Sequence, residues 1–322
     1  LLIKEQYIYT KSWVLRKKLS FVQIKHSLRR WLGLDRGTKM RSEKVMIDLI
    51  KKFAEQDERI RAVGMNGSRT NLKVPKDPFQ DYDIVYFVTD MDSFINRVDW
   101  IKVFGELIIM QRPDHSVLYP SNRDQYAYLM LFTDGNRIDL TLWPVEKSNE
   151  WIQDDKLAKV LLDKDHIFPK LPSPTDEDYW VKKPSQQVFN DCTNEFWWVS
   201  TYVAKGLWRN EILYAMDHLQ IIRSMLLKML EWKVGIETNF TVSIGKNGKY
   251  LERYLEKDIW NTLLNTYPKG NIDNIWDALL TMTNLFEELT LEVANQLQFN
   301  YSFTEVKKVQ AYLKHVQTIT FG

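Results

Sequence analysis

The spacing of hydrophobic positions changes along the chain from a strand-like to a helical pattern. An amphipathic helix is predicted over 42–56, where Ser42 can cap the first turn. Runs rich in β-forming residues then predict strands over 60–66, 81–88, 106–111, 126–133 and 137–143. Asp134-Gly135-Asn136, between the last two strands, is a hairpin signal. We expect these strands to form a mixed sheet that ends near Trp143.

The second half of the chain has helical periodicity. Four prolines from residue 168 to residue 184 indicate a linker. Helices are predicted from near residue 186, around 212–226, and over 249–266, 272–297 and 304–317. The expected fold class is α+β, with an N-terminal mixed-sheet domain followed by a C-terminal helical domain. We expect these domains at 40–170 and 171–322, preceded by an extension at 1–39.

Composition limits the class of protein. The chain has 322 residues, 44% of them hydrophobic, and can bury a sizeable core. The sequence contains no run of about 18 apolar residues, so no membrane-spanning helix is predicted. The single cysteine, Cys192, cannot form an internal disulfide and is compatible with a reducing compartment. We therefore expect a cytoplasmic protein without a membrane partner, and the oligomeric state stays open.

The net charge of +2 conceals two oppositely charged parts. Residues 1–39 contain ten Lys or Arg and two acids, a net +8, whereas the remaining 34 basic and 40 acidic residues give a net −6. The acidic body disfavours a nucleic-acid partner and suits a cationic small molecule. For 1–39, three interpretations stay open: a membrane-surface or nucleic-acid arm, a targeting segment, and an upstream translated or expression-derived extension. We favour the extension.

Three aspartates form the candidate chemical centre. Asp81 and Asp83 open a predicted strand two residues apart, so their side chains share a face, and Asp139 lies within the last predicted strand. Neighbouring carboxylates repel each other, and a hard cation such as Mg²⁺ relieves that repulsion while also binding phosphate oxygens. We predict that Asp81, Asp83 and Asp139 are catalytic metal ligands.

A glycine-serine turn follows the first predicted strand. Gly67 lets the backbone approach a phosphate closely, and the Ser68 hydroxyl can donate to its oxygens. We predict nucleotide contacts at Gly67, Ser68 and Arg69, with bracing of the loop as the alternative for Arg69. Charge that develops on a leaving pyrophosphate would be stabilised by such fixed donors.

A second candidate surface lies on the helix predicted from near residue 186. Its apolar stripe is expected to pack on the core and consists of Phe189, Cys192, Phe196, Val199 and Val203. The opposite stripe contains Asp191, Glu195, Trp198, Tyr202 and Lys205. Carboxylates beside aromatic rings suit a guanidinium-bearing small molecule. We predict substrate contacts at the first four and a phosphate contact at Lys205, with an ordinary solvated helix face as the alternative.

The order of these motifs resembles the nucleotidyltransferase superfamily that includes DNA polymerase β. The closer resemblance is to the aminoglycoside 6-adenylyltransferases, the streptomycin-modifying enzymes. It rests on Gly67-Ser68-Arg69-Thr70-Asn71, Phe79-Gln80-Asp81-Tyr82-Asp83-Ile84, Ile138-Asp139-Leu140-Thr141-Leu142, Cys192-Thr193-Asn194-Glu195-Phe196-Trp197 and Trp232-Lys233-Val234-Gly235-Ile236-Glu237-Thr238. The resemblance runs from residue 40 to at least residue 300 and is absent from 1–39 and 318–322.

The resemblance implies a reaction. ATP and Mg²⁺ would be the co-substrates, AMP would be transferred to the 6-hydroxyl of streptomycin, and pyrophosphate would leave, which confers antibiotic resistance. Asp81, Asp83 and Asp139 match the family's acidic positions, and Gly67 and Ser68 match its phosphate loop. Two alternatives stay open: nucleotide transfer to another small molecule, RNA or protein, and a catalytically inactive nucleotide-binding regulatory module.

Overall fold

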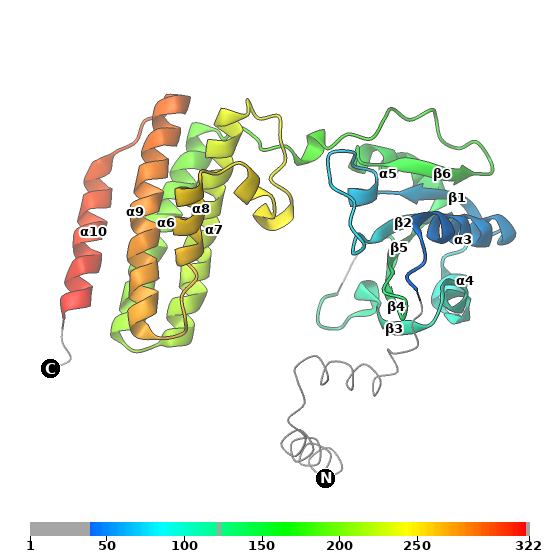
Figure 1. Cartoon of the computed structure of the whole chain (residues 1–322), viewed down its shortest axis with the longest axis horizontal. Helices are drawn as coiled ribbons and strands as arrows, with labels where there is room; N and C mark the ends of the chain where they lie inside the picture. The colour runs from blue at the N-terminus through cyan, green and yellow to red at the C-terminus, as the bar shows by residue number, and fades with distance from the viewer. Residues whose placement is uncertain (1–38, 121–123, 320–322) are drawn as a thin grey trace, which may run out of the picture. The chain divides into compact units, whose positions relative to one another are not determined.

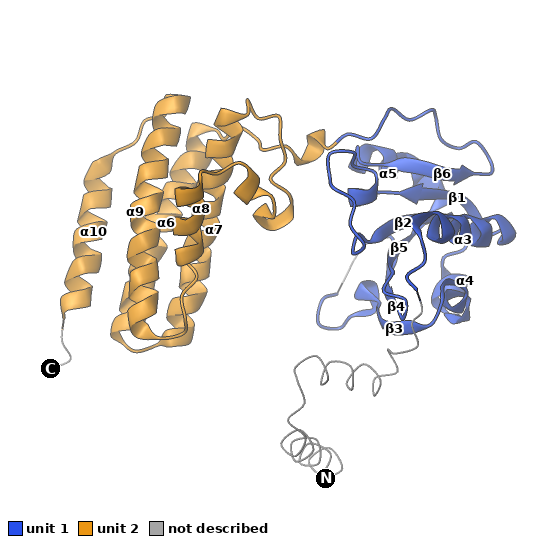
Figure 2. Cartoon of the chain, in the orientation of Figure 1, with its two compact units in different colours: residues 1–175 blue, residues 176–322 orange. Residues whose placement is uncertain are grey.

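The computed structural model describes residues 39–120 and 124–319 of the chain, which divides into two compact units, 1–175 and 176–322 (Figures 1 and 2). The division falls between Thr175 and Asp176, within the proline-rich segment that the sequence marks as a linker. Our interpretation of 1–39 lies outside the described residues, apart from Lys39.

Unit 1 is built on a six-stranded mixed sheet with the strand order β3-β4-β5-β2-β1-β6. The five predicted strands are confirmed, and their bounds are β1 Ile60–Met65, β2 Tyr82–Val88, β3 Leu107–Gln111, β4 Tyr126–Phe132 and β5 Arg137–Pro144. β2 and β5 are parallel, and the other neighbouring pairs are antiparallel. The predicted hairpin between β4 and β5 is confirmed, with Gly135 at φ +88°, which suits glycine.

The prediction that the sheet ends near Trp143 is wrong. After the short helix α5 (Ser148–Asp154), strand β6 (Lys159–Asp163) pairs antiparallel with β1 and forms an edge of the sheet. β6 is only five residues long, and none of them is fully buried. A half-exposed edge strand does not need the strict alternation of polar and apolar residues by which a strand is recognised in a sequence.

The two faces of the sheet carry separate cores. Helix α3 (Glu43–Gln56) packs on one face, where Met46 and Ile50 enter the core. Ser42 caps its first turn, as predicted. Ile84, Tyr86 and Val88 of β2 share that core, which also includes the short helix α4 (Asp92–Ile95). On the other face, residues of β2 and β5 pack with α5, through Val85, Phe87, Trp143 and Trp151. Since side chains alternate along a strand, Asp83 and Asp139 lie on this second face.

Unit 2 is a helical unit, so the predicted α+β fold class is confirmed (Figure 1). Its helices are α6 Gln186–Trp208, α7 Ile212–Glu237, α8 Lys257–Asn265, α9 Ile272–Leu297 and α10 Phe303–Thr318. α6 packs against α7, α9 and α10, and one core extends through the unit. The helix predicted over 249–266 begins too early, because Leu251–Arg253 forms a single 3-10 turn and Glu256 is extended before α8 starts.

Among the described residues, no helix is both long enough and apolar enough to cross a membrane.

Candidate active site

Parallel pairing of β2 with β5 brings two of the predicted aspartates together. Asp83 and Asp139 are direct register partners, so their side chains leave neighbouring strands at the same level and on the same face. Asp81 stands one residue before β2, in the segment that leads into it. Asp139, which is distant in the sequence, therefore joins Asp81 and Asp83 at one end of this strand pair.

Arg137 holds two of these carboxylates on one guanidinium group. Its Nε and Nη2 donate to the two oxygens of Asp139, each at 2.7 Å, and its Nε lies 3.6 Å from Asp81 Oδ2. The sequence places Arg137 on the same strand face as Asp139, but our prediction gave it no role in the site. The signal was the two-residue spacing, which alone does not distinguish an ion pair from two independently solvated groups.

The carboxylates are electrostatically crowded. Burial, together with the neighbouring charges of Asp139 and Asp81, raises the pKa of Asp83 to about 6. Burial also raises the pKa of Asp81, although Arg137 partly opposes that effect. The hydrogen bonds to Asp139 raise the pKa of Arg137. Crowded anions of this kind favour a cation among them.

The donor set fits a hard divalent cation, because every side chain that it offers is a carboxylate. In the structure Asp139 turns its oxygens to Arg137, and the described residues contain no group of three or more acidic, histidine or cysteine side chains already arranged around a metal position. The carboxylate donors thus match the chemistry of Mg²⁺. In this structure the positive charge beside them comes from Arg137.

The glycine-serine turn packs directly against Asp83. Gly67–Arg69 forms a 3-10 turn after β1, and the Asn66 N–H donates to the Asp83 carbonyl at 2.9 Å. Gly67 has φ +73°, and a Cβ added there would overlap Asp83 Oδ2. Glycine is therefore required both for the backbone conformation and for the close approach of the turn to the carboxylate.

Ser68 lies at the edge of a cavity of about 740 Å³ in unit 1. Lys76, Lys159 and Lys170 are among the residues that line this cavity, whereas the three aspartates are not. The lining also includes the acidic residues Glu43 and Asp163, so the cavity beside the turn has side chains of both charges.

The contacts of Arg69 are those of a brace. Its Nε donates to the Asp81 carbonyl at 3.0 Å and its Nη2 to the Gln80 carbonyl at 2.7 Å. The guanidinium group lies 3.7 Å from the centre of the Tyr82 ring, and the side chain is only 7% exposed. Arg69 thus fixes the segment that carries Asp81, which corresponds to the bracing alternative.

The turn is held in place by hydrogen bonds to residues that the sequence prediction missed. The Trp151 indole N–H donates to Asn66 Oδ1 at 2.7 Å, and the Thr70 hydroxyl lies 2.9 Å from the Leu157 carbonyl. Each contact joins segments more than 80 residues apart. The local sequence pattern carries no signal for such pairs.

The predicted stripes on α6 are confirmed as opposite faces of the helix. Phe189, Cys192, Phe196, Val199 and Val203 are buried in the core of unit 2. Asp191 and Glu195 are exposed, Trp198 is 59% exposed, and Tyr202 and Lys205 are partly exposed.

Three side chains of the exposed α6 face form a connected row. The Trp198 indole N–H donates to the Tyr202 hydroxyl at 2.7 Å, and Lys205 Nζ lies 4.5 Å from the centre of the Tyr202 ring. Asp191 accepts a hydrogen bond from Gln187 at 2.7 Å. The row offers an aromatic surface with carboxylates along the same face, and it belongs entirely to unit 2.

Comparison with known proteins identifies the family. The sequence model of the streptomycin adenylyltransferase family matches residues 40–316. The chain belongs to this family. It is therefore a nucleotidyltransferase, an enzyme of the class for which ATP is the AMP donor.

Three relatives match most of the chain. An aminoglycoside 6-adenylyltransferase from Campylobacter jejuni is 47% identical over 269 residues, which are 83% of this chain and 93% of that protein. Proteins of the same name from Bacillus subtilis and Staphylococcus aureus are 45% and 38% identical and cover 81% and 86% of this chain, and 93% and 99% of their own lengths. The match to the family begins at Met40, so residues 1–39 lie outside it.

Proposed function

We propose that this adenylyltransferase transfers AMP from ATP, with Mg²⁺, to the 6-hydroxyl of streptomycin or a related aminoglycoside, and releases pyrophosphate. The observation that carries the proposal is the convergence of Asp81, Asp83 and Asp139 beside the Gly67 turn, within a chain that belongs to the streptomycin adenylyltransferase family. The names of its relatives support the choice of acceptor.

Each part of the carboxylate site has a role in this proposal. Asp81, Asp83 and Asp139 would hold Mg²⁺, which when bound neutralises charge on the polyphosphate. The Ser68 hydroxyl and the backbone of the Gly67 turn would hold phosphate oxygens. Arg69 keeps Asp81 in place through its two carbonyl contacts.

The transfer itself is a substitution at phosphorus. The acceptor oxygen forms a bond to the α-phosphorus of ATP, the bond from that phosphorus to the bridging oxygen breaks, and pyrophosphate carries away the electron pair. The proton of the hydroxyl goes to a base. Proximity and fixed charge supply most of the rate in this class of reaction, which agrees with a site made of carboxylates and a rigid turn.

The exposed face of α6 is the proposed acceptor surface. Asp191 and Glu195 would pair with the cationic groups of the drug, and Trp198 with Tyr202 would stack against them. Lys205, beside Tyr202, would contact a phosphate. An adenylylated drug would no longer fit its ribosomal target, so the reaction would give resistance.

The test is a panel of aminoglycosides assayed for pyrophosphate release with the full chain. Release is expected only when ATP, Mg²⁺ and streptomycin or a close relative are all present, and mass spectrometry should show one AMP joined to the drug. Asp83→Asn should abolish release while the circular dichroism spectrum is retained. Transfer of labelled AMP to RNA or protein, with no aminoglycoside accepted, would overturn the choice of acceptor.

A further inference from the structure

The geometry points to Arg137 as a built-in counter-ion that neutralises the carboxylate site in the metal-free enzyme and is displaced when a divalent cation binds. This inference rests on the proposed function, because it takes Asp81, Asp83 and Asp139 as the metal ligands. It adds a positioning role for a residue outside that ligand set.

Arg137 and a metal would use the same carboxylate oxygens. Its two nitrogens engage both oxygens of Asp139 at 2.7 Å, which is the bidentate geometry that makes arginine–carboxylate pairs strong. The same group lies 3.6 Å from Asp81. A cation that binds these carboxylates must therefore replace at least part of the arginine contact.

Arg137 can leave the site, whereas Arg69 cannot. The Arg137 side chain is 42% exposed, and its described hydrogen bonds are both to Asp139. Arg69 is 7% exposed, donates to two carbonyls and lies on Tyr82, so its release would open the loop. Of the two guanidinium groups at the site, Arg137 is the one that can turn to solvent at small cost.

The charge balance of the site calls for a positive group when no metal is bound. Three carboxylates gather there, and Asp83 is largely covered by the Gly67 turn and the sheet. Leaving them without a cation would be strongly unfavourable. Arg137 keeps the metal-free fold intact and, by the same contact, lowers metal affinity, because binding must first break the ion pair.

The experiment measures Mn²⁺ affinity, without nucleotide, on the full chain by electron paramagnetic resonance. Arg137→Gln should bind Mn²⁺ roughly tenfold more tightly than the unmodified protein, the size of one lost charge–charge contact. Arg137→Lys keeps the charge but loses the bidentate contact, so its affinity should fall between the two. Arg97→Gln removes an exposed arginine away from the site and should leave the affinity unchanged.

Thermal unfolding of the same proteins gives a second readout that does not depend on turnover. Without metal, Arg137→Gln should melt at a lower temperature than the unmodified chain, and added Mn²⁺ should narrow or reverse that difference. Equal or weaker Mn²⁺ binding by Arg137→Gln overturns the counter-ion role. If neither the unmodified protein nor any variant binds Mn²⁺, the proposed metal site of three carboxylates is wrong, and the counter-ion role of Arg137 is overturned with it.

Discussion

Gly67 lies directly against the carboxylate of Asp83, so the phosphate-loop candidate and the metal-ligand candidate form one packed unit. A Cβ on Gly67 would overlap Asp83 Oδ2 and lie 2.9 Å from its Cγ. The residue also has φ +73°, where side chains other than glycine are strained. The position of the turn and the orientation of Asp83 are therefore fixed together.

Gly67→Ala should lower kcat/KM for pyrophosphate release by at least about 100-fold, because a small displacement of reacting groups is enough for such a loss. The matched control is Gly270→Ala, since a Cβ at Gly270 meets nothing within 4 Å and should leave activity unchanged. Steady-state assays with both variants check the prediction. Full activity in Gly67→Ala would show that the turn and Asp83 can separate without consequence.

Asp83→Asn should make the metal-free protein more stable above about pH 6. The pKa of Asp83 is raised from 3.8 to about 6, so the folded state holds this proton more tightly than the unfolded chain does. The ionised group therefore destabilises the fold: the penalty is absent below about pH 4, grows between 4 and 6, and then stays constant, at on the order of 3 kcal/mol.

Urea unfolding of Asp83→Asn and the unmodified chain at several pH values measures this difference. The gap in unfolding free energy should close as the pH falls through this window, and Mg²⁺ should stabilise only the unmodified chain. Asp48→Asn removes an exposed carboxylate of α3 and serves as the control. A gap that widens at low pH would contradict the assigned cause.

The parts of the fold that the sequence predicts are those with strong local periodicity. β5 is hydrophobic on alternate residues and β2 is a continuous hydrophobic run after Asp83, so both the strands and the candidate ligands can be recognised. The short edge strand β6 lacks that periodicity. The two faces of α6 were also predictable, because buried and exposed residues separate cleanly on a long helix.

The parts that could not be predicted depend on contacts between distant segments. Arg137 reaches Asp81 only because β5 lies beside β2, and Trp151 reaches Asn66 across 85 residues. The role of Arg69 as a brace also required the structure, because its partners are backbone carbonyls, which every residue has. Side chains that orient other groups are therefore less visible in a sequence than those that carry charge into a site.

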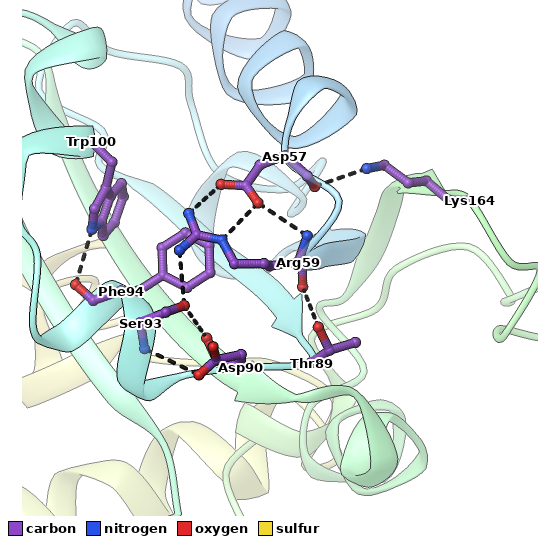
Figure 3. Close-up of polar contacts among 8 residues, drawn as sticks. All are labelled: Asp57, Arg59, Thr89, Asp90, Ser93, Phe94, Trp100 and Lys164. Atoms are coloured by element: carbon purple, nitrogen blue, oxygen red, sulfur yellow. Dashed lines mark hydrogen bonds and ion pairs between the residues drawn. The ribbon is translucent and has the colours of Figure 1, made fainter.

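A second polar network stabilises the opposite end of β1 and β2 (Figure 3). Arg59 donates to Asp57 at 2.9 Å and to the Ser93 hydroxyl at 2.8 Å, and its guanidinium lies 3.9 Å from the centre of the Phe94 ring. It ties the end of α3 to α4. The register pairs Ile60 with Val88 at this end and Met65 with Ile84 at the other, so the network is remote from Gly67.

Arg59→Ala should lower the unfolding free energy of the protein by about 1 kcal/mol, because it leaves a partly buried carboxylate without its partner. Its hydrogen bonds lower the pKa of Asp57, so this stability is present above about pH 4 and is lost as the pH falls further. KM and kcat of the folded enzyme should not change. Lys102→Ala breaks an exposed ion pair and should have no measurable effect on urea unfolding.

Substitutions on the exposed face of α6 should change KM for the drug and leave KM for ATP unchanged. Glu195→Gln and Trp198→Ala should each raise KM for streptomycin by roughly 5- to 30-fold, since each removes one contact to a cationic ligand worth about 1–2 kcal/mol. KM for ATP should not change, because the predicted ATP contacts on α6 are limited to Lys205. Glu288→Gln removes an exposed carboxylate from α9 and controls for the general loss of negative charge. Calorimetric titration with streptomycin should give the same order of affinities as the kinetics. Unchanged drug affinity in both α6 variants would mean that this face is solvated surface and that the acceptor binds elsewhere.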